Sequence, residues 1–560
     1  MQTLPDALRH HLRFTSPAKA RKDLPGKARR RPLHATNKLF EEAAMTTCLR
    51  SYVCGAWVTG TGEKSPLYNP TTEAIVAETS TEGIDFSKAL AFARDEGGPA
   101  LRAMTFAERG EMLVKVAKAI HEYREELIDL AIQNGGNTRS DAKFDIDGAT
   151  GTLSYYGKLG QKLGAEKVLT DGDSIQLTRN PRWVGQHLYT PLRGAAIHIN
   201  AFNFPAWGMM EKAACALLAG MPVVTKPATS TALVAYRIAE IAIESGLLPK
   251  GSFTFIGGNP GDMLDHVDWQ DVIAFTGSSD TGLMIRSREN ILKHNVRVNV
   301  EADSLNAAVL GPDLETEDET YDLFLREVSK DMTQKAGQKC TAIRRILVPA
   351  DMMDAVKEDL SRELSEAPVG NPAEKGVKVG PLATARQVKD ACTGLERLKE
   401  VAKPVYGDGS RGELVGVEGD AGYFFGPVLL EATDARAPAI HDREIFGPVA
   451  TLIPYSGKAE EAAEILGLGR GSLVSSVYSD KADFALTMTT EVAPFLGRLH
   501  LASKKVAELS AGPGVVMPTL VHGGPGRAGG GEELGGERGL TFYMQRTAVQ
   551  GYQPLLEKLK

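Results

Sequence analysis

The sequence predicts an α/β protein whose main sheet is parallel and doubly wound. After Gly194, short apolar runs of β character alternate with helical runs, and this rhythm requires parallel strands joined by crossover helices. A second α/β pattern begins after Glu301 and continues to about Leu520. The chain has 560 residues, 42% of them hydrophobic and 24% charged, so it is long and apolar enough for two or three domains with their own cores.

Residues 1–44 differ from the rest of the chain in charge. They contain ten Lys or Arg and only four Asp or Glu, whereas the whole chain has a formal net charge of −7. Their low hydrophobicity and basic composition predict a disordered extension. A transit peptide is the alternative, but the arginines follow no clear amphipathic period. The first strand is predicted at Tyr52 to Val58.

The next segment is predicted to be helical and then extended. Thr105 and Glu108 have the spacing of a capping box, and apolar residues recur at helical spacing until Gly135-Gly136, which is expected to close the helical stretch. From Asp171 to Tyr189 there is little apolar clustering, and Pro181 and Trp183 interrupt it, so this segment predicts an extended arm.

The parallel sheet is predicted from five β runs with helices between them, including a helix from Leu233 to Ser245 that Gly246 closes. The runs are Ala195 to Asn200, Pro222 to Lys226, Ser252 to Ile256, Asp271 to Phe275 and Val296 to Glu301. In such sheets ligands bind beyond the carboxyl ends of the strands. Four polar residues fall at or just after predicted strand ends, namely Asn203, Lys226, Ser278 and Glu301.

Cys340 is the candidate nucleophile. Lys335, Lys339, Arg344 and Arg345 are close to it in sequence, and positive charge would stabilise its thiolate. A structural cysteine that fills a small gap in the core is the alternative reading of this segment. A cysteine that attacks a carbonyl also needs an oxyanion donor and a base that activates water. Asn203 and Glu301 are the candidates for these two roles.

Three motifs in chain order resemble the aldehyde dehydrogenase superfamily: Asn203-Phe-Pro, Glu301 at a strand end, and Gly337-Gln-Lys-Cys340. The resemblance extends from about Met45 to the C-terminus. It implies a Rossmann-type parallel-sheet cofactor domain, an α/β catalytic domain and a β oligomerisation arm. The implied division is 45–170 with 191–302 for the NADP-binding domain, 303–520 for the catalytic domain, and 171–190 with 537–560 for the arm.

The resemblance also implies a nicotinamide cofactor. Gly277 and Ser278 would hold its pyrophosphate at a helix start, although an ordinary serine N-cap is the alternative. Many NAD-preferring members carry a glutamate three positions after the lysine, where this chain has Thr229 after Lys226. The missing carboxylate predicts NADP as the preferred cofactor; the alternative is that Thr229 is only a helix N-cap and both NADP and NAD bind. Glu444 matches the glutamate that binds the nicotinamide ribose, with Phe446 packed beside the ring.

The mechanism that the resemblance implies is oxidation of an aldehyde through a thiohemiacetal and a thioester on Cys340. Asn203 would stabilise the oxyanion, and Glu301 would activate the water that releases the acid. Two positions depart from the general pattern: Phe202, where tryptophan is common, and Ala302-Asp303-Ser304, which replaces Leu-Gly-Gly. The second change affects the fit of the nicotinamide.

Three segments together resemble one narrow branch of the superfamily: Glu301-Ala-Asp-Ser-Leu-Asn306, Lys335-Ala-Gly-Gln-Lys-Cys-Thr-Ala-Ile-Arg-Arg345, and His522 to Gly536. That branch oxidises coenzyme A thioester semialdehydes from aerobic opening of aromatic rings. The implied substrate is 3,4-dehydroadipyl-CoA semialdehyde or its phenylacetate-pathway counterpart, 3-oxo-5,6-dehydrosuberyl-CoA semialdehyde. The segment from His522 to Gly536 is rich in glycine, but Arg527, Glu532 and Glu533 interrupt it, so we expect an ordered loop before a final strand from Leu540 to Val549.

Composition disfavours several other classes of protein. The mildly acidic balance argues against a nucleic-acid partner, and no run approaches the length of a membrane helix. Five cysteines without zinc-ligand spacing indicate a reducing compartment, the cytoplasm, and the histidines predict no metal site. The two arm segments predict at least a homodimer. A catalytically silent dehydrogenase fold and a cysteine hydrolase without cofactor are the rival functions.

Overall fold

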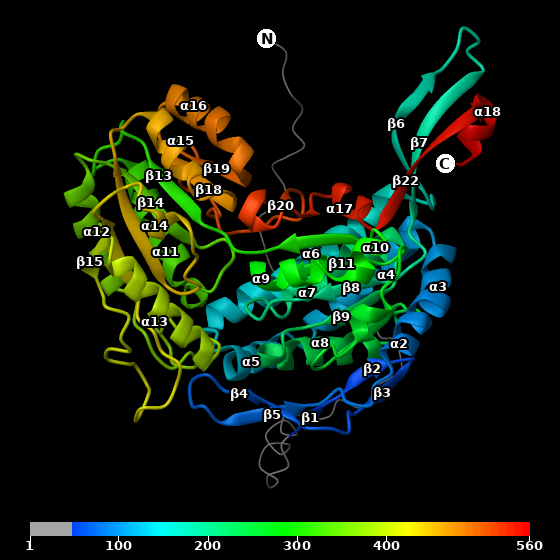
Figure 1. Cartoon of the computed structure of the whole chain (residues 1–560), viewed down its shortest axis with the longest axis horizontal. Helices are drawn as coiled ribbons and strands as arrows, with labels where there is room; N and C mark the ends of the chain where they lie inside the picture. The colour runs from blue at the N-terminus through cyan, green and yellow to red at the C-terminus, as the bar shows by residue number, and fades with distance from the viewer. Residues whose placement is uncertain (1–46, 560) are drawn as a thin grey trace, which may run out of the picture. The chain divides into compact units, whose positions relative to one another are not determined.

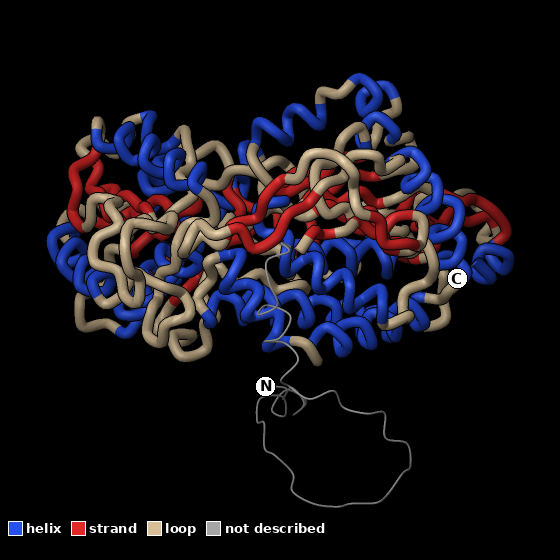
Figure 2. The backbone as a smooth tube through the Cα atoms, turned by 90° about the horizontal axis from the view of Figure 1, so that it is seen from below, coloured by secondary structure: helices blue, strands red, loops and turns tan. Residues whose placement is uncertain are grey.

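The computed structural model describes residues 47–559, so the prediction for residues 1–44 lies outside the described part of the chain. The described residues form two seven-stranded sheets (Figure 1), and Figure 2 shows the strands as a layer with helices on both sides. The neighbours in the first sheet are, in order, β12, β11, β8, β9, β10, β2 and β3. The pairings from β12 to β10 are all parallel, as the sequence predicts, while β2 and β3 add an antiparallel edge.

The strands of the first sheet agree with the predicted runs except at the front of the chain. β8, β9, β10 and β11 are almost entirely buried, as expected for parallel strands covered on both faces. The prediction of one strand from Tyr52 to Val58 is wrong, because the chain reverses at Cys54 and Gly55, whose φ angles are 51° and 80°. The bounds are β2 Ser51–Val53, β3 Ala56–Val58, β8 Ala196–Ile199, β9 Val223–Lys226, β10 Phe253–Phe255, β11 Val272–Thr276 and β12 Arg297–Glu301.

Helices cover this sheet, and the predicted capping box of Thr105 and Glu108 starts the first long one. The helical stretch that was expected to continue to Gly135 is interrupted at Tyr123, so it forms two helices, α4 and α5. α7 is buried all round, which agrees with its mostly apolar sequence. The helices are α2 Phe86–Phe92, α3 Gly98–Ala103, α4 Phe106–His121, α5 Arg124–Gly135, α6 Arg139–Leu163, α7 Trp207–Ala219, α8 Ala232–Glu244, α9 Ser279–Arg286 and α10 Glu289–Lys293, and a small separate sheet consists of β1 Cys48–Leu49, β4 Ser65–Tyr68 and β5 Ile75–Thr79.

The second sheet follows the first without a long connection. Only residues 302–305 separate the end of β12 from the start of β13, which lies inside the second sheet. Its neighbours are, in order, β15, β16, β17, β14, β13, β18 and β19, and all pairings except that of β15 are parallel. The bounds are β13 Asn306–Leu310, β14 Ile343–Pro349, β15 Ala402–Tyr406, β16 Val428–Ala432, β17 Val449–Tyr455, β18 Ser472–Tyr478 and β19 Leu496–Ala502, with helices α11 Glu319–Thr333, α12 Met353–Ser365, α13 Ala385–Lys399, α14 Pro438–His441, α15 Ala459–Gly467 and α16 Ala482–Val492.

The segment predicted as an extended arm is a β-hairpin, and the last strand of the chain joins it. β6 Leu169–Gln176 and β7 Trp183–Pro191 pair antiparallel, and β22 Met544–Tyr552 adds to the other edge of β7 (Figure 1). This last strand begins at Met544 rather than at the predicted Leu540, because the short helix α17 Arg538–Thr541 comes first. α18 Gln553–Leu556 follows it.

The glycine-rich segment after His522 is ordered into two short antiparallel strands, β20 Val521–Gly523 and β21 Glu532–Leu534. Gly523 has a φ of 142°, and a Cβ there would meet the Gly531 carbonyl oxygen at 2.0 Å. A side chain at this position therefore cannot fit, which explains one of the glycines. Within residues 47–559, no helix is long and apolar enough to cross a membrane.

Candidate functional site

The three predicted catalytic residues line one pocket between the two sheets. Asn203 follows β8, Glu301 ends β12, and Cys340 comes after the one-turn helix Gln334–Gly337. Phe144, Trp207, Val516 and His522 are among the other residues that line this pocket. The placement agrees with the rule that sites form beyond the carboxyl ends of parallel strands.

An unusual backbone conformation presents Cys340 to the pocket. Three successive residues have positive φ angles, 55° at Lys335, 51° at Ala336 and 68° at Gly337. A Cβ on Gly337 would lie 2.4 Å from the Gly447 carbonyl carbon, so only glycine fits. Asn306 holds the other side of the loop, since its Nδ2 donates to the carbonyl oxygens of Cys340 and Ala342, at 2.8 Å each. The cysteine is therefore fixed by backbone contacts on both sides.

The amide of Asn203 faces the same loop. Its Nδ2 donates to the Gln338 carbonyl oxygen at 3.0 Å, and the residue is only 8% exposed. A primary amide carries two N–H donors, so one stays available to an oxygen atom in the pocket.

Glu301, His522 and Cys340 form a compact cluster, in which the glutamate and the histidine are buried and the cysteine is partly buried. His522 Nε2 lies 3.1 Å from Glu301 Oε2 and 3.9 Å from Cys340 Sγ. Burial by itself raises the pKa of Glu301, but the charge and hydrogen bond of His522 outweigh it and bring the pKa to about 2. Burial lowers the pKa of His522, but Glu301 outweighs that effect and the pKa is raised. Both pKa shifts are in the direction that favours a carboxylate paired with an imidazolium.

The thiol of Cys340 sits in an unfavourable environment for ionisation. Burial, and after it the Glu301 carboxylate, raises the pKa of Cys340 well above its usual value. Glu211 and Lys212 of α7 lie in the same pocket, and the Lys212 ammonium is 3.0 Å from Glu533 Oε2 and 3.7 Å from Glu211 Oε1. Burial raises the pKa of Glu211 to about 7.

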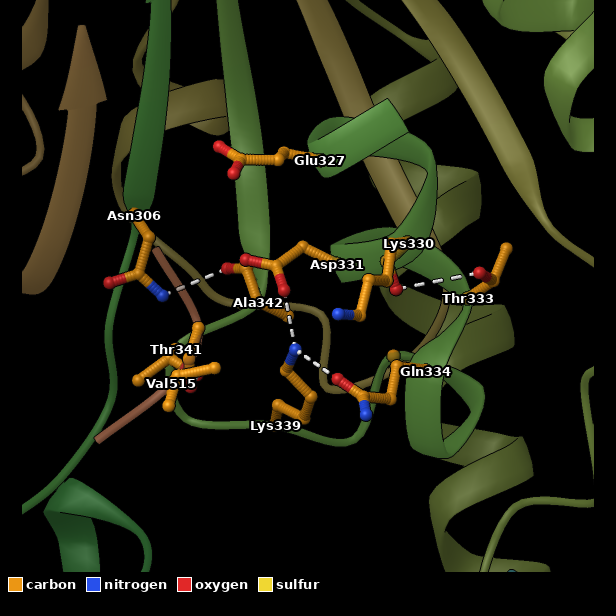
Figure 3. A network of polar contacts seen from close by, with 12 residues as sticks. Asn306, Glu327, Lys330, Asp331, Thr333, Gln334, Lys339, Thr341, Ala342 and Val515 are labelled. Atoms are coloured by element: carbon orange, nitrogen blue, oxygen red, sulfur yellow. Dashed lines mark hydrogen bonds and ion pairs between the residues drawn. The ribbon is translucent and has the colours of Figure 1, made fainter. Parts of the chain in front are cut away.

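The prediction that neighbouring basic residues stabilise the Cys340 thiolate is wrong. Figure 3 shows Lys339 between Asp331 and Gln334, to which its ammonium donates. The Lys335 ammonium lies over the Phe204 ring at 4.4 Å. Arg344 donates to Glu444 and to backbone carbonyls, and Arg345 donates to backbone carbonyls including that of Leu305. Closeness in sequence does not orient these side chains toward the sulfur.

Lys226 and Thr229 lie at the carboxyl end of β9, as predicted. Within residues 47–559, no carboxylate pairs with the Lys226 ammonium, and burial lowers the pKa of Lys226 to about 8. The alternative that Thr229 caps a helix with its side chain is wrong, because it lies inside a short 3₁₀ turn without a capping hydrogen bond, and Thr231 is the N-cap residue of α8. A partly buried cation of this kind, without a carboxylate partner, suits an anionic ligand.

Gly277 and Ser278 lie at the start of α9. A Cβ on Gly277 would come within 2.6 Å of the Phe275 ring, so the turn requires glycine. The Ser278 side chain accepts a hydrogen bond from the Thr281 N–H and is thus the N-cap, as the alternative reading had it. Asp303, one of the departures from the general pattern, accepts from the Ser279 N–H at 3.1 Å and its hydroxyl at 2.7 Å.

Glu444 connects the predicted cofactor side of the site to the cysteine loop. Its carboxylate accepts from Arg344 at 3.1 and 3.2 Å and from the Ser304 N–H at 3.0 Å, while burial raises its pKa to about 7. Phe446 packs edge to face with Phe202, with 5.7 Å between ring centroids. Glu444 and Phe446 are thus close to the loop that carries Cys340.

Three functional candidates escaped the sequence reasoning: His522, Glu211 and Lys212. His522 stands in the segment that was recognised as ordered, but 182 residues separate it from Cys340. A buried Glu-Lys pair on an apolar helix was the only signal for the other two.

The chain is similar to known proteins in sequence and in fold. A sequence model described as "Aldehyde dehydrogenase family" matches residues 57–549. The chain is 43% identical to 3,4-dehydroadipyl-CoA semialdehyde dehydrogenase of Aromatoleum evansii over 478 residues, which cover 85% of this chain and 93% of that protein. It is 28% identical to geranial dehydrogenase of Castellaniella defragrans, covering 87% and 95%. Among solved structures, lactaldehyde dehydrogenase of Escherichia coli has a TM-score of 0.79 at 23% identity, covering 90% and 99%, and a betaine aldehyde dehydrogenase mutant of Staphylococcus aureus has 0.79 at 23%, covering 92% and 97%.

Proposed function

The chain belongs to the aldehyde dehydrogenase family, and from this premise we propose that it oxidises a coenzyme A semialdehyde to the acid with NADP as hydride acceptor. The observation that supports this most directly is the convergence of Asn203, Glu301 and Cys340 on one pocket. These residues come from three separate segments, and a silent scaffold has no need to keep them together. A cysteine hydrolase would leave the unpaired Lys226 and the Gly277 turn unexplained.

In the proposed mechanism the Cys340 thiolate adds to the aldehyde carbon. The free N–H of the Asn203 amide and the Cys340 backbone N–H donate to the oxyanion of the resulting thiohemiacetal. Lys226, Ser278 and Glu444 would hold NADP, which would supply the hydride acceptor needed to convert the thiohemiacetal into a thioester on Cys340. Glu301 then takes a proton from water, and the hydroxide attacks the thioester and releases the acid and the thiol. The Glu301 side chain lies within 4.8 Å of the sulfur, close enough to hold that water beside the thioester.

The residues around the expected cofactor position fit a dinucleotide. Lys226 offers a partly buried ammonium without a carboxylate partner among the described residues, and Thr229 leaves room where a carboxylate would repel a 2′-phosphate. Glu444 would bind the nicotinamide ribose and Phe446 would pack beside the ring. Ser278 and the start of α9 would hold the pyrophosphate.

The substrate class rests on the relative from Aromatoleum, which covers most of the chain. We propose 3,4-dehydroadipyl-CoA semialdehyde, with the phenylacetate-pathway 3-oxo-5,6-dehydrosuberyl-CoA semialdehyde as the alternative. The cations on α9 and α10 give little support for a coenzyme A phosphate site. Arg286 donates to the Gly529 carbonyl oxygen, and Arg288 pairs with Asp265, so a solvated helix face explains them better.

The arm of β6, β7 and β22 supports a homodimer or a larger homo-oligomer. The β22 strand presents mostly exposed residues along an outer edge, where a strand of a second copy could pair. We place the protein in the cytoplasm because all five cysteines are free thiols, Cys48, Cys54, Cys215, Cys340 and Cys392.

The proposed function is tested by measuring NADPH and NADH formation in parallel with a medium-chain aldehyde and with the coenzyme A semialdehyde. We expect the highest kcat/KM with NADP and the thioester substrate. Turnover of the simple aldehyde alone would refute the substrate class and retain the reaction. Cofactor binding without turnover of any aldehyde would favour the silent scaffold.

Replacing Thr229 with glutamate is expected to shift the cofactor preference toward NAD. A carboxylate at this position would repel the 2′-phosphate and accept hydrogen bonds from ribose hydroxyls, so kcat/KM for NADP should fall about 10- to 100-fold. The value for NAD should stay equal or rise. Thr229→Gln, which has the same size without the charge, is the matched control. An equal loss with both cofactors, or equal effects of Glu and Gln, would contradict the assignment.

NADP affinity is expected to weaken as the pH rises through about 8. Burial lowers the pKa of Lys226 to about 8, so the ammonium that meets the 2′-phosphate is fully present below this pH and is lost above it. The dissociation constant for NADP, measured by calorimetry from pH 6.5 to 9.5, should rise up to tenfold per unit above pH 8. NAD should show a much flatter curve, and Lys226→Arg should flatten the NADP curve. Identical curves for both cofactors in the unsubstituted protein would refute the role of Lys226.

A further inference from the structure

The Cys340 sulfur needs a counter-charge that its sequence neighbours do not provide. The thiol is buried beside the Glu301 carboxylate, and both effects oppose its ionisation. Lys335, Lys339 and the two following arginines all have partners away from the sulfur. Any nucleophilic role for Cys340 therefore depends on another cation in the pocket.

His522 is in the position to supply this charge. Its Nε2 is 3.9 Å from Cys340 Sγ and, through the same nitrogen, 3.1 Å from Glu301 Oε2. Both side chains of the His522–Glu301 pair are only 4% exposed, so water screens the interaction little. The short strand β20 fixes the imidazole, because β21 pairs with it and Gly523 allows the close approach of Gly531.

We propose that His522 is the counter-ion of the Cys340 thiolate and the positioning residue of Glu301. The protonated Nε2 of His522 then lies beside both the Cys340 thiolate and the Glu301 carboxylate. Ionisation of Cys340 breaks its S–H bond and releases the proton to water in the pocket, while the proton on Nε2 stays on the imidazole. His522 contacts Oε2 of Glu301, and the proposal assigns the attacking water to Oε1.

The other charged groups around His522 are compatible with this role. Glu211 and Lys212 face it from α7, Arg498 from β19 and Glu533 from β21. Lys212 pairs with Glu211 and Glu533, whereas His522 pairs with Glu301. Arg498 is the second cation whose charge reaches the sulfur, but its head group donates to the Val515 carbonyl oxygen at 2.6 Å. Substitution of Arg498 therefore serves as a comparison for substitution of His522.

The test is the pH dependence of Cys340 alkylation by iodoacetamide in the full-length protein without cofactor or aldehyde. The thiolate attacks the methylene carbon and iodide leaves, and the rate is followed on the Cys340 peptide by mass spectrometry, because Cys54 and Cys392 are also exposed. His522→Phe should raise the midpoint pH of alkylation by at least one unit and lower the rate at pH 7 about tenfold or more. His522→Asn, which keeps a polar side chain of similar size, should give the same shift.

Two controls separate the charge from folding. His500→Asn removes the histidine of another His-Glu pair, in which Nε2 lies 3.4 Å from Glu327, and should leave the midpoint unchanged. Arg498→Gln should shift it less than the His522 variants. Unchanged midpoints in both His522 variants, with cooperative melting preserved, would overturn the proposal, as would a shift that only Arg498→Gln produces.

The role of His522 in catalysis rests on the proposed dehydrogenase function. The alkylation experiment does not depend on that function, because it uses neither cofactor nor aldehyde. If His522 variants shift the alkylation midpoint while the unsubstituted protein oxidises no aldehyde, the proposed function fails and the counter-ion stands. If aldehyde oxidation is confirmed and the midpoints do not move, the counter-ion fails alone.

Discussion

Replacing Cys340 with alanine is expected to abolish aldehyde oxidation, with kcat lowered on the order of 10⁴-fold or more. The substitution removes the sulfur that adds to the aldehyde carbon in the proposed mechanism. Without it no thiohemiacetal forms, so the species that donates the hydride is missing. The loop should keep its shape, because its contacts run through backbone atoms to Asn306 and to Gly447. The measurement is NADPH formation at saturating aldehyde and NADP.

Cys392→Ala and Cys54→Ala are the matched controls, since both thiols are exposed and lie outside the pocket. They should retain full activity, and NADP should bind equally to all three variants. Substantial oxidation by the Cys340 variant would exclude the thiohemiacetal route. It would also revive the reading of Cys340 as a structural residue.

Replacing Glu301 with glutamine is expected to separate the two halves of the reaction. Hydride transfer does not need the base, so one equivalent of NADPH per site should form in a rapid burst. Hydrolysis of the thioester should then slow about 10²- to 10³-fold, the range for loss of a general base. Stopped-flow absorbance measures the burst, and mass spectrometry of the quenched protein should find the acyl group on Cys340.

Glutamine keeps the size of Glu301, so the expected effect is chemical rather than one of packing. Glu532→Gln, on the neighbouring strand β21 and exposed to solvent, is the control and should show no burst beyond that of the unsubstituted protein. Equal slowing of burst and steady state would place Glu301 in the hydride-transfer step and exclude it as the base of hydrolysis.

The sequence predicted the positions of the strand ends better than the directions of individual side chains. β8, β9, β11 and β12 could be located because buried parallel strands have continuous apolar sequences bounded by polar residues. This placed Asn203 and Glu301 at the same edge of one sheet. The reversal at Cys54-Gly55 was missed because that dipeptide carries neither Asn nor Asp, the usual signals of a tight hairpin.

The cluster around Cys340 shows why the rest could not be predicted. Lys335 lies in the turn with three positive φ angles, while Arg344 and Arg345 are successive residues of β14 and point to opposite faces of the strand, so the four basic residues gave a false impression of a cationic site. His522 reaches the sulfur only through the pairing of β20 with β21, a contact that depends on tertiary structure. Local sequence patterns cannot predict a contact between residues so far apart in the chain.

The short link of residues 302–305 has a mechanical consequence. Glu301 stands at one end of it, and β13, whose Asn306 holds the Cys340 loop, begins at the other. If the two sheets rotate relative to each other about this link, the displacement of an atom grows with its distance from the link. Atoms at the rim of the cleft then move far, while atoms beside the link barely move. The base and the nucleophile lie close to the link. Such a motion would widen the mouth of the cleft and leave the spacing of Glu301 and Cys340 almost unchanged.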